Sequence, residues 1–144
     1  QMLLGRGACT YARVSLAGCG GFTGAKKIPA LAEAHHCTLV PHNPLSPVTT
    51  NAVLQFAAAT ENVAIAEYPD PYKASTADNL LNTGIKLRQA DMVDHIPEFK
   101  EGYLLVPEEP GLGIDLISDV EERFPFRPHA VSARLNLDGS ICDQ

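Results

Sequence analysis

The first 70 residues alternate between short apolar runs and helix-like segments, and this alternation restricts the fold more than any other feature of the chain. The strand candidates are residues 9–16, 37–41 and 62–68, and the helix candidates are residues 23–36 and 49–59. Short links join them, which is typical of parallel βαβ units. The sequence therefore predicts an α/β fold in which neighbouring strands end at one common edge.

Two residues bear on where the first predicted helix begins. Thr23 is the expected N-cap, because its hydroxyl can accept a hydrogen bond from a free backbone N–H. Pro29 lies inside the same segment, where a proline removes one helical hydrogen bond and costs on the order of 3 kcal/mol. We therefore expect the helix either to start late or to kink at Pro29.

The chain changes character after the run Tyr68-Pro69-Asp70-Pro71, so we expect two parts, residues 1–70 and residues 71–144. The second part is more polar and irregular. It predicts a strand over 102–106 and a short helix capped by Ser118 and ending at Arg123, whereas 80–88 is compatible with helix or loop. The tail should pack on another part of the protein, because it carries apolar residues without periodicity: Phe124, Phe126, Val131 and Leu135.

Composition excludes several classes of protein. The formal net charge of -6 disfavours nucleic-acid binding, and no apolar run reaches the roughly 18–20 residues that a membrane span needs. No basic and apolar secretory signal precedes residue 8. The four cysteines lack the clustered spacing of a zinc site, so we expect reduced, mostly buried thiols in a cytoplasmic protein: Cys9, Cys19, Cys37 and Cys142.

One polar residue stands at the end of each predicted strand of the first part: Ser15, His42 and Glu67. Side chains at the carboxyl ends of parallel strands converge on the ligand site of such folds. His42 could act as a general acid or base near neutral pH, and Glu67 could hydrogen-bond a substrate. The alternatives are a histidine that only bonds locally in its loop and a carboxylate that faces water.

The glycine cluster from Gly18 to Gly24 invites comparison with a phosphate-binding loop. It has neither the GxGxxG spacing, since Thr23 stands where the third glycine belongs, nor the GxxxxGK[ST] pattern. We therefore expect a turn between strand and helix that needs close backbone approach.

Three longer segments carry a resemblance to a known family. They are Gly20 to Ile28 (GGFTGAKKI), Ala32 to His35 (AEAH) and Pro41 to Val48 (PHNPLSPV). Together they resemble the enolase superfamily, in particular the mandelate racemase group and its sugar-acid dehydratases of the galactonate dehydratase type. Later segments that fit the same family are Glu67-Tyr68-Pro69, Gly102-Tyr103-Leu104 and Pro110 to Ile114. The resemblance implies a (β/α)7β TIM-like barrel, of which this chain supplies the last three βα units followed by an extension that packs on the barrel or its capping domain.

The resemblance also implies roles for the residues at the strand ends. His42 and Glu67 fall on the histidine of the family's seventh strand and the glutamate of its eighth. Ser15 replaces the aspartate that pairs with the histidine, and because a hydroxyl cannot offset the imidazolium charge, proton abstraction by His42 should be weakened. The family's Mg²⁺ ligands lie on earlier strands, so they are absent from this chain.

The function implied for the full-length parent is dehydration of a small sugar acid. A proton leaves the carbon next to the carboxylate, and loss of water gives a 2-keto-3-deoxy sugar acid. We expect the isolated chain to be inactive and, because its sheet edges are open, to form a homo-oligomer. The alternatives are a non-catalytic barrel fragment that needs an oligomer or a partner chain, and a racemase or cycloisomerase that uses the same proton abstraction.

Overall fold

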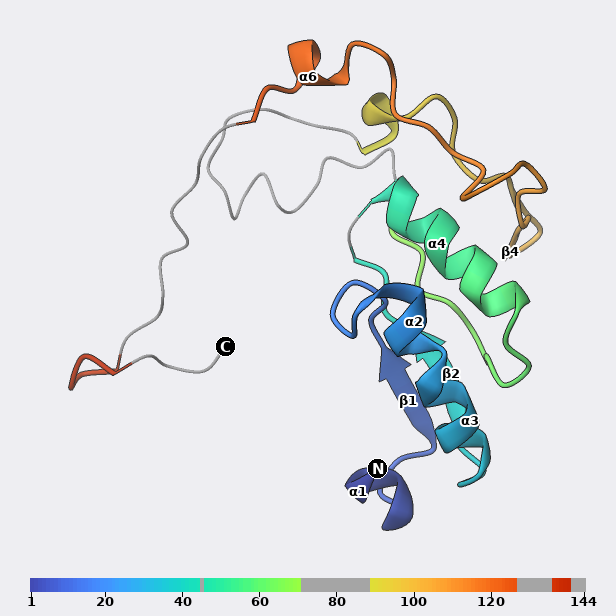
Figure 1. Cartoon of the computed structure of the whole chain (residues 1–144), viewed down its shortest axis with the longest axis vertical. Helices are drawn as coiled ribbons and strands as arrows, with labels where there is room; N and C mark the ends of the chain where they lie inside the picture. The colour runs from blue at the N-terminus through green and yellow to red at the C-terminus, as the bar shows by residue number, and fades with distance from the viewer. Residues whose placement is uncertain (45, 71–88, 127–135, 141–144) are drawn as a thin grey trace.

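The computed structural model describes residues 1–44, 46–70, 89–126 and 136–140. The first part contains α1 (Met2–Gly5), β1 (Tyr11–Val14), α2 (Gly21–Ala25), α3 (Lys27–Glu33), β2 (Thr38–Pro41) and α4 (Pro47–Ala58). The later part contains a 3₁₀ helix η1 (Gln89–Met92), β3 (Phe99–Lys100), β4 (Tyr103–Leu104) and α6 (Val120–Arg123). Figure 1 shows α2 and α3 one after the other alongside β1 and β2. This is the α/β arrangement that the sequence predicts.

β1 and β2 pair in parallel, with Tyr11 opposite Thr38 and Val14 opposite Pro41. The predicted third strand over 62–68 is reduced to one isolated parallel bridge, between Leu39 and Val63. Backbone bonds from Leu39 N to Asn62 O and from Ala64 N to Leu39 O flank that bridge, at 2.8 and 2.9 Å. The predicted parallel order is therefore confirmed, but a regular third strand is wrong.

A register shift interrupts residues 62–68, which we call the third segment. Regular parallel pairing would continue from Ala64 to a bond between residue 66 and Pro41 O, but Glu67 N donates to Pro41 O instead, at 3.3 Å. The one extra residue is a β-bulge. Because side chains alternate between the two faces of a strand, the bulge moves Glu67 onto the opposite face from Val63. Val63 packs against the hydrophobic core, whereas Glu67 points to the other side.

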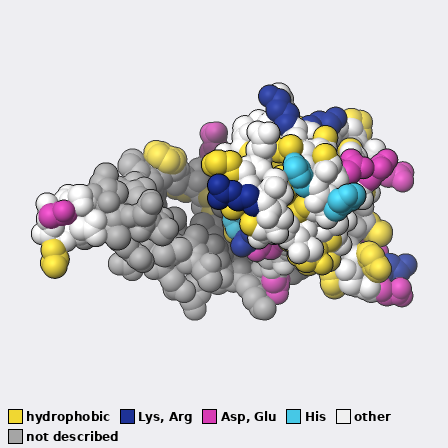
Figure 2. All heavy atoms as spheres, turned by 90° about the horizontal axis from the view of Figure 1, so that it is seen from below, with side chains coloured by type: hydrophobic (Ala, Val, Ile, Leu, Met, Phe, Trp, Pro, Cys, Tyr) yellow, Lys and Arg dark blue, Asp and Glu magenta, His cyan; other side chains and the backbone are white. Residues whose placement is uncertain are grey.

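The hydrophobic core lies on one face of the sheet, under the helices. Leu39 is fully buried at its centre, and the surrounding side chains come from β1, α2, α3 and α4. They include Val14, Ala25, Ala32, Val53 and Phe56. The opposite face is open, since Tyr11 and the side chain of Arg13, which alternate with the buried Val14 along β1, are both 59% exposed. On the face shown in Figure 2, hydrophobic side chains lie among charged side chains and histidines.

The predicted helix over 23–36 is two helices, and Thr23 is not its N-cap. α2 starts at Gly21 behind Gly20, which has a φ of 89°, and α3 starts at Lys27. Pro29 thus lies in the first turn of α3, where a backbone N–H has no intrahelical acceptor and none is lost. The helix that contains Pro29 thus starts late, as one of the two alternatives predicted, but a separate helix that was not predicted, α2, precedes it.

α4 begins at Pro47, before the predicted Thr49 or Thr50, because Ser46 caps it. The Ser46 hydroxyl accepts from Thr49 N at 3.3 Å, and Pro47 occupies the first helical position, which proline favours. Two polar side chains of α4 hold the later chain. Asn51 Nδ2 donates to Leu112 O and Gly113 O, both at 3.0 Å, and Gln55 Nε2 donates to Pro107 O at 2.9 Å. This part of residues 71–144 therefore packs on the first part.

Several further predictions are corrected or fall outside the described residues. The N-cap of α6 is Asp119 rather than Ser118, and the strand expected over 102–106 covers only Tyr103–Leu104. Phe126 is 90% exposed rather than packed. Segment 80–88, the residues Val131 and Leu135, and Cys142 lie outside the described ranges.

The other three cysteines carry free thiols, of which only Cys37 is buried. Burial raises the pKa of the Cys37 thiol. Within the described ranges, no helix has the length and apolar character required to cross a bilayer.

Candidate active site at the carboxyl ends of the parallel segments

His42 follows β2 directly and meets Glu67 from the third segment. Its backbone N–H donates to Val14 O at 2.7 Å, which continues the β1–β2 pairing by one residue. The imidazole Nδ1 lies 2.7 Å from Oε2 of Glu67. Both side chains are partly exposed, at 33% for His42 and 39% for Glu67. The expectation that these two side chains lie together at one rim of the parallel segments is confirmed, whereas their catalytic roles stay a prediction.

Arg13 completes the cluster from β1. Its Nη2 donates to both carboxylate oxygens of Glu67, at 2.7 and 2.9 Å, and it also contacts Nδ1 of His42. The Arg13 side chain is 59% exposed, so it adds a positive charge at the solvent-exposed side of the site. Arg13 and Ser15 are two residues apart on the predicted strand over 9–16, so alternation puts them on one face. This pattern is the available signal, but it does not by itself single out Arg13 as a site residue.

Asn43 holds Glu67 from the turn after β2. Its backbone N–H donates to Oε2 at 2.8 Å, and its side-chain Nδ2 donates to the backbone O of Glu67 at 3.1 Å and to Thr50 Oγ1 at 2.8 Å. The Asn43 side chain is fully buried. It thus links the loop after β2, α4 and the third segment, and sequence reasoning gave it no role because its partners lie far along the chain.

These donors keep Glu67 ionised. The Asn43 N–H, followed by the Arg13 and His42 side chains, lowers the pKa of Glu67 from 4.5 to about 2, against the opposing effect of burial. The carboxylate is therefore negative throughout the physiological range. It can accept hydrogen bonds and stabilise a positive imidazole, but it is not a proton donor near neutral pH.

Ser15 does not join this cluster. Its hydroxyl accepts from Gly18 N at 3.2 Å and its carbonyl accepts from Cys19 N at 3.0 Å, so it closes the turn after β1. No hydrogen bond joins it to His42. The expectation that Ser15 stands in for an imidazole-orienting aspartate therefore has no support in the geometry.

The glycine cluster is a turn with close backbone approach, as predicted. A Cβ added to Gly24 would lie 1.7 Å from Cys19 O, which leaves room only for glycine.

Magnesium does not fit the residues of this site. Across the described ranges, no three histidine, cysteine, aspartate or glutamate side chains form a group that could hold a metal ion. The carboxylate of Glu67 already accepts bonds from Arg13, His42 and Asn43. A cationic guanidinium beside the carboxylate also repels a divalent cation.

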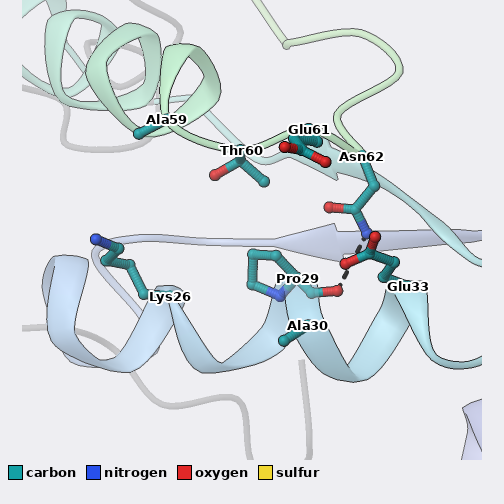
Figure 3. A pocket seen from close by; sticks show the side chains of 8 residues that line it. All are labelled: Lys26, Pro29, Ala30, Glu33, Ala59, Thr60, Glu61 and Asn62. Atoms are coloured by element: carbon teal, nitrogen blue, oxygen red, sulfur yellow. Dashed lines mark hydrogen bonds between the residues drawn. The ribbon is translucent and has the colours of Figure 1, made fainter.

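A cleft of about 340 Å³ lies away from this cluster, between α3 and the chain that follows α4 (Figure 3). Its lining includes Lys26, Glu33 and Glu61. At one end Asn62 Nδ2 donates to Pro29 O at 3.1 Å and to Cys37 O at 3.3 Å, which ties α3 to the sheet. Because it lies on the outer, helical side of the sheet, the cleft is not where residues at the strand ends converge.

The sequence model of the family described as enolase C-terminal domain-like matches residues 1–120. The chain belongs to this family. Among curated relatives, it is 29% identical to a D-galactonate dehydratase family member of Streptomyces bingchenggensis, over 99% of this chain and 32% of the relative. It is 33% identical to the D-galactarolactone cycloisomerase of Agrobacterium fabrum, over 84% of this chain and 31% of the relative. The chain thus spans about a third of the length of these relatives.

Solved structures agree with this membership. An Agrobacterium radiobacter enolase, described as a candidate galactarate dehydratase and bound to Na and L-malate, superposes with a TM-score of 0.73 at 28% identity, over 96% of this chain and 35% of that one. An enolase from Sargasso Sea environmental sequencing superposes with a TM-score of 0.69 at 31% identity, over 86% and 30%. The enolase-superfamily resemblance that the sequence carries is therefore confirmed, with sugar-acid dehydratases and a cycloisomerase among the relatives.

Proposed function

We propose that this chain is the C-terminal portion of an enolase-superfamily dehydratase that acts on a sugar acid. The observation that carries the proposal is the contact of 2.7 Å between His42 Nδ1 and Glu67 Oε2 at the ends of two parallel segments. Relatives named as dehydratases of galactonate and mannonate support the substrate class. The domain division at residue 70 and a homo-oligomeric state remain part of this proposal.

The chemistry assigned to this chain is proton transfer by His42. The imidazole takes a proton from the carbon next to the substrate carboxylate, or gives a proton to the leaving hydroxyl. The pair of electrons left on carbon forms the double bond as the C–O bond breaks. The hydroxyl gains a proton and leaves as water, and the proton removed from carbon balances the proton that the hydroxyl gains. The resulting enol becomes a 2-keto-3-deoxy sugar acid. The ionised Glu67 stabilises the imidazolium that forms when His42 accepts a proton.

The isolated chain should be inactive, because three parallel segments leave a barrel open and the described residues hold no metal site. A chimera tests the proposal. The first two thirds of the Streptomyces relative are joined to, or mixed with, this chain, and keto-acid formation is followed with galactonate, mannonate and galactarate. Activity that disappears in His42→Gln supports the proposal. A folded chimera that forms no keto acid contradicts it, and turnover by the isolated chain contradicts the predicted inactivity.

A cycloisomerase is the second candidate, favoured by the 33% identity to the Agrobacterium fabrum enzyme. The same proton abstraction would serve it, since both reactions begin at the carbon next to a carboxyl group. Incubation of the chimera with a galactarolactone in D2O separates the two. Isomerisation without loss of water indicates a cycloisomerase, and loss of water indicates a dehydratase.

A further inference from the structure

We propose that Glu67, rather than Ser15, is the positioning residue of His42, and that it holds the ring with a proton on Nδ1 so that Nε2 is the basic nitrogen. The catalytic use of this arrangement rests on the proposed function. The tautomer of the His42 ring, however, can be measured without substrate or turnover. It changes the role of Glu67 from a group that binds substrate to one that orients the base.

Distances support Glu67 over Ser15. Oε2 of Glu67 lies 2.7 Å from Nδ1 of His42, which is hydrogen-bond distance. The Ser15 hydroxyl accepts from Gly18 N in the turn after β1 and has no bond to His42. Among the described residues, the carboxylate that meets the imidazole is therefore that of Glu67, from the third segment.

Nδ1 of His42 has two neighbours, one a hydrogen-bond acceptor and the other a donor. Glu67 Oε2 can only accept a hydrogen bond, whereas Arg13 Nη2 can only donate one. A neutral ring can satisfy one of them. With a proton on Nδ1 it donates to Glu67, and with a lone pair on Nδ1 it accepts from Arg13.

Glu67 and Arg13 differ in how firmly each side chain is held and in the other hydrogen bonds that each one makes. The backbone N–H of Asn43, whose side chain is buried, donates to Oε2 at 2.8 Å, and Asn43 Nδ2 bonds the backbone of Glu67 as well. Arg13 is 59% exposed and already donates to both oxygens of Glu67. Placing a lone pair of Nδ1 against the fixed, ionised Oε2 would be repulsive. The bond to Glu67 therefore decides the tautomer.

The bulge in the third segment is what makes this contact possible. Without the extra residue, Glu67 would point to the same side as Val63, toward the core. With it, Glu67 N meets Pro41 O at 3.3 Å and the carboxylate reaches the ring that follows Pro41. During proton transfer, Nε2 gains the proton from carbon, the Nδ1 proton stays on the ring, and Glu67 remains ionised.

Nitrogen NMR of the full 144-residue chain tests the inference directly. Long-range ¹H–¹⁵N spectra of the ¹⁵N-labelled chain report which ring nitrogen carries the proton, and the His42 signals are identified by their loss in His42→Gln. At a pH where the ring is neutral, we expect the Nδ1 shift of a protonated nitrogen and the Nε2 shift of an unprotonated one. The Nε2–H tautomer, which free histidine prefers, would overturn the inference.

Variants separate the two candidate partners. Glu67→Gln should exchange the two nitrogen shifts, because the Arg13 donor then meets Nδ1 without an opposing anion. Ser15→Ala is the matched control and should leave both shifts where they are. An unchanged tautomer in Glu67→Gln, or a changed one in Ser15→Ala, overturns the inference. If Glu67→Gln does not fold, as judged by circular dichroism, the wild-type spectrum alone decides.

The outcome is distinguishable from that of the proposed function. A chimera without activity whose His42 carries the Nδ1 proton refutes the dehydratase and leaves the positioning role intact. An active chimera whose His42 carries the proton on Nε2 supports the dehydratase and refutes the positioning role of Glu67.

Discussion

Replacing Asn43 tests whether hydrogen-bond donors, rather than packing, hold the site together. Asn43 is fully buried, and its Nδ2 donates to Thr50 Oγ1 at 2.8 Å and to Glu67 O at 3.1 Å. Its Oδ1 has no hydrogen-bond partner among the described residues. Asn43→Ala removes the donors and leaves a small void, whereas Asn43→Asp keeps the shape but replaces the donor nitrogen with an oxygen.

The structure predicts that Asn43→Asp is less stable than Asn43→Ala, although aspartate is closer to asparagine in size. Each lost neutral hydrogen bond is worth about 1 kcal/mol, so Asn43→Ala should lower the free energy of unfolding by about 2 kcal/mol. Asn43→Asp loses the same two bonds and places a buried carboxylate near that of Glu67. An uncompensated buried charge costs about 3–5 kcal/mol. The isosteric variant should therefore be the less stable one.

Urea unfolding at pH 7, followed by circular dichroism at a helix wavelength, measures both effects as shifts of the transition midpoint. Asn136→Asp is the matched control, because it also loses a donor bond, from Nδ2 to Ser140 Oγ at 3.0 Å, but at an exposed position where water replaces the lost partner and the cost stays within about 0.5 kcal/mol. The reasoning is refuted if Asn43→Asp is as stable as the wild type or more stable than Asn43→Ala. That result would show that the side chain serves only to fill space.

Two further predictions concern Gly24, which packs against the turn after β1, and the loss of stability at acid pH. Gly24→Ala should abolish cooperative thermal unfolding, because its Cβ would lie 1.7 Å from Cys19 O. Gly18→Ala is the control and should melt close to the wild type, because the nearest atom to its Cβ lies at 3.4 Å. Equal melting temperatures for the two variants would contradict the turn geometry. The pKa of Glu67 is lowered to about 2, so its contribution is complete above pH 4.5 and is lost as the pH falls toward 2. Since the side chain is 39% exposed, solvent screening reduces this contribution to about 1 kcal/mol. Urea unfolding at pH 5 and pH 3 should show this loss in the wild type and not in Glu67→Gln, and equal pH dependence would contradict it.

Local patterns in the sequence were enough to place β1, β2 and α4 within a few residues. Apolar runs bounded by glycine or proline predicted β1 and β2, and their short links predicted parallel pairing. The register, with Tyr11 opposite Thr38, came only from the structure. The helix starts were wrong by a few residues. Ser46 caps α4, which starts at Pro47 rather than at the predicted residue 49, because the extended backbone of Ser46 lets its hydroxyl accept from Thr49 N. Gly20, with a φ of 89°, precedes α2 in place of the predicted cap Thr23.

The sequence predicted that two residues of the site meet, but not the other contacts around them. The positions of His42 and Glu67 at strand ends were sufficient to predict that they meet, because parallel strands end at one edge. The sequence could not show that the Ser15 hydroxyl bonds to Gly18 N. Strand alternation puts Arg13 on the same face as Ser15, but it does not show that Arg13 meets both His42 and Glu67, since Arg13 lies before the end of its strand.

The order of strands and helices, the parallel pairing of β1 with β2 and the family of the chain are properties that the sequence determined by itself, because periodicity, turn residues and motifs act over short stretches of chain. The bulge that turns Glu67 toward His42 was decided only by the tertiary structure. In this position the carboxylate accepts bonds from Asn43 and Arg13, which lie 24 and 54 residues away along the chain. Such bonds form only after the segments have packed, so no local pattern in the sequence encodes them.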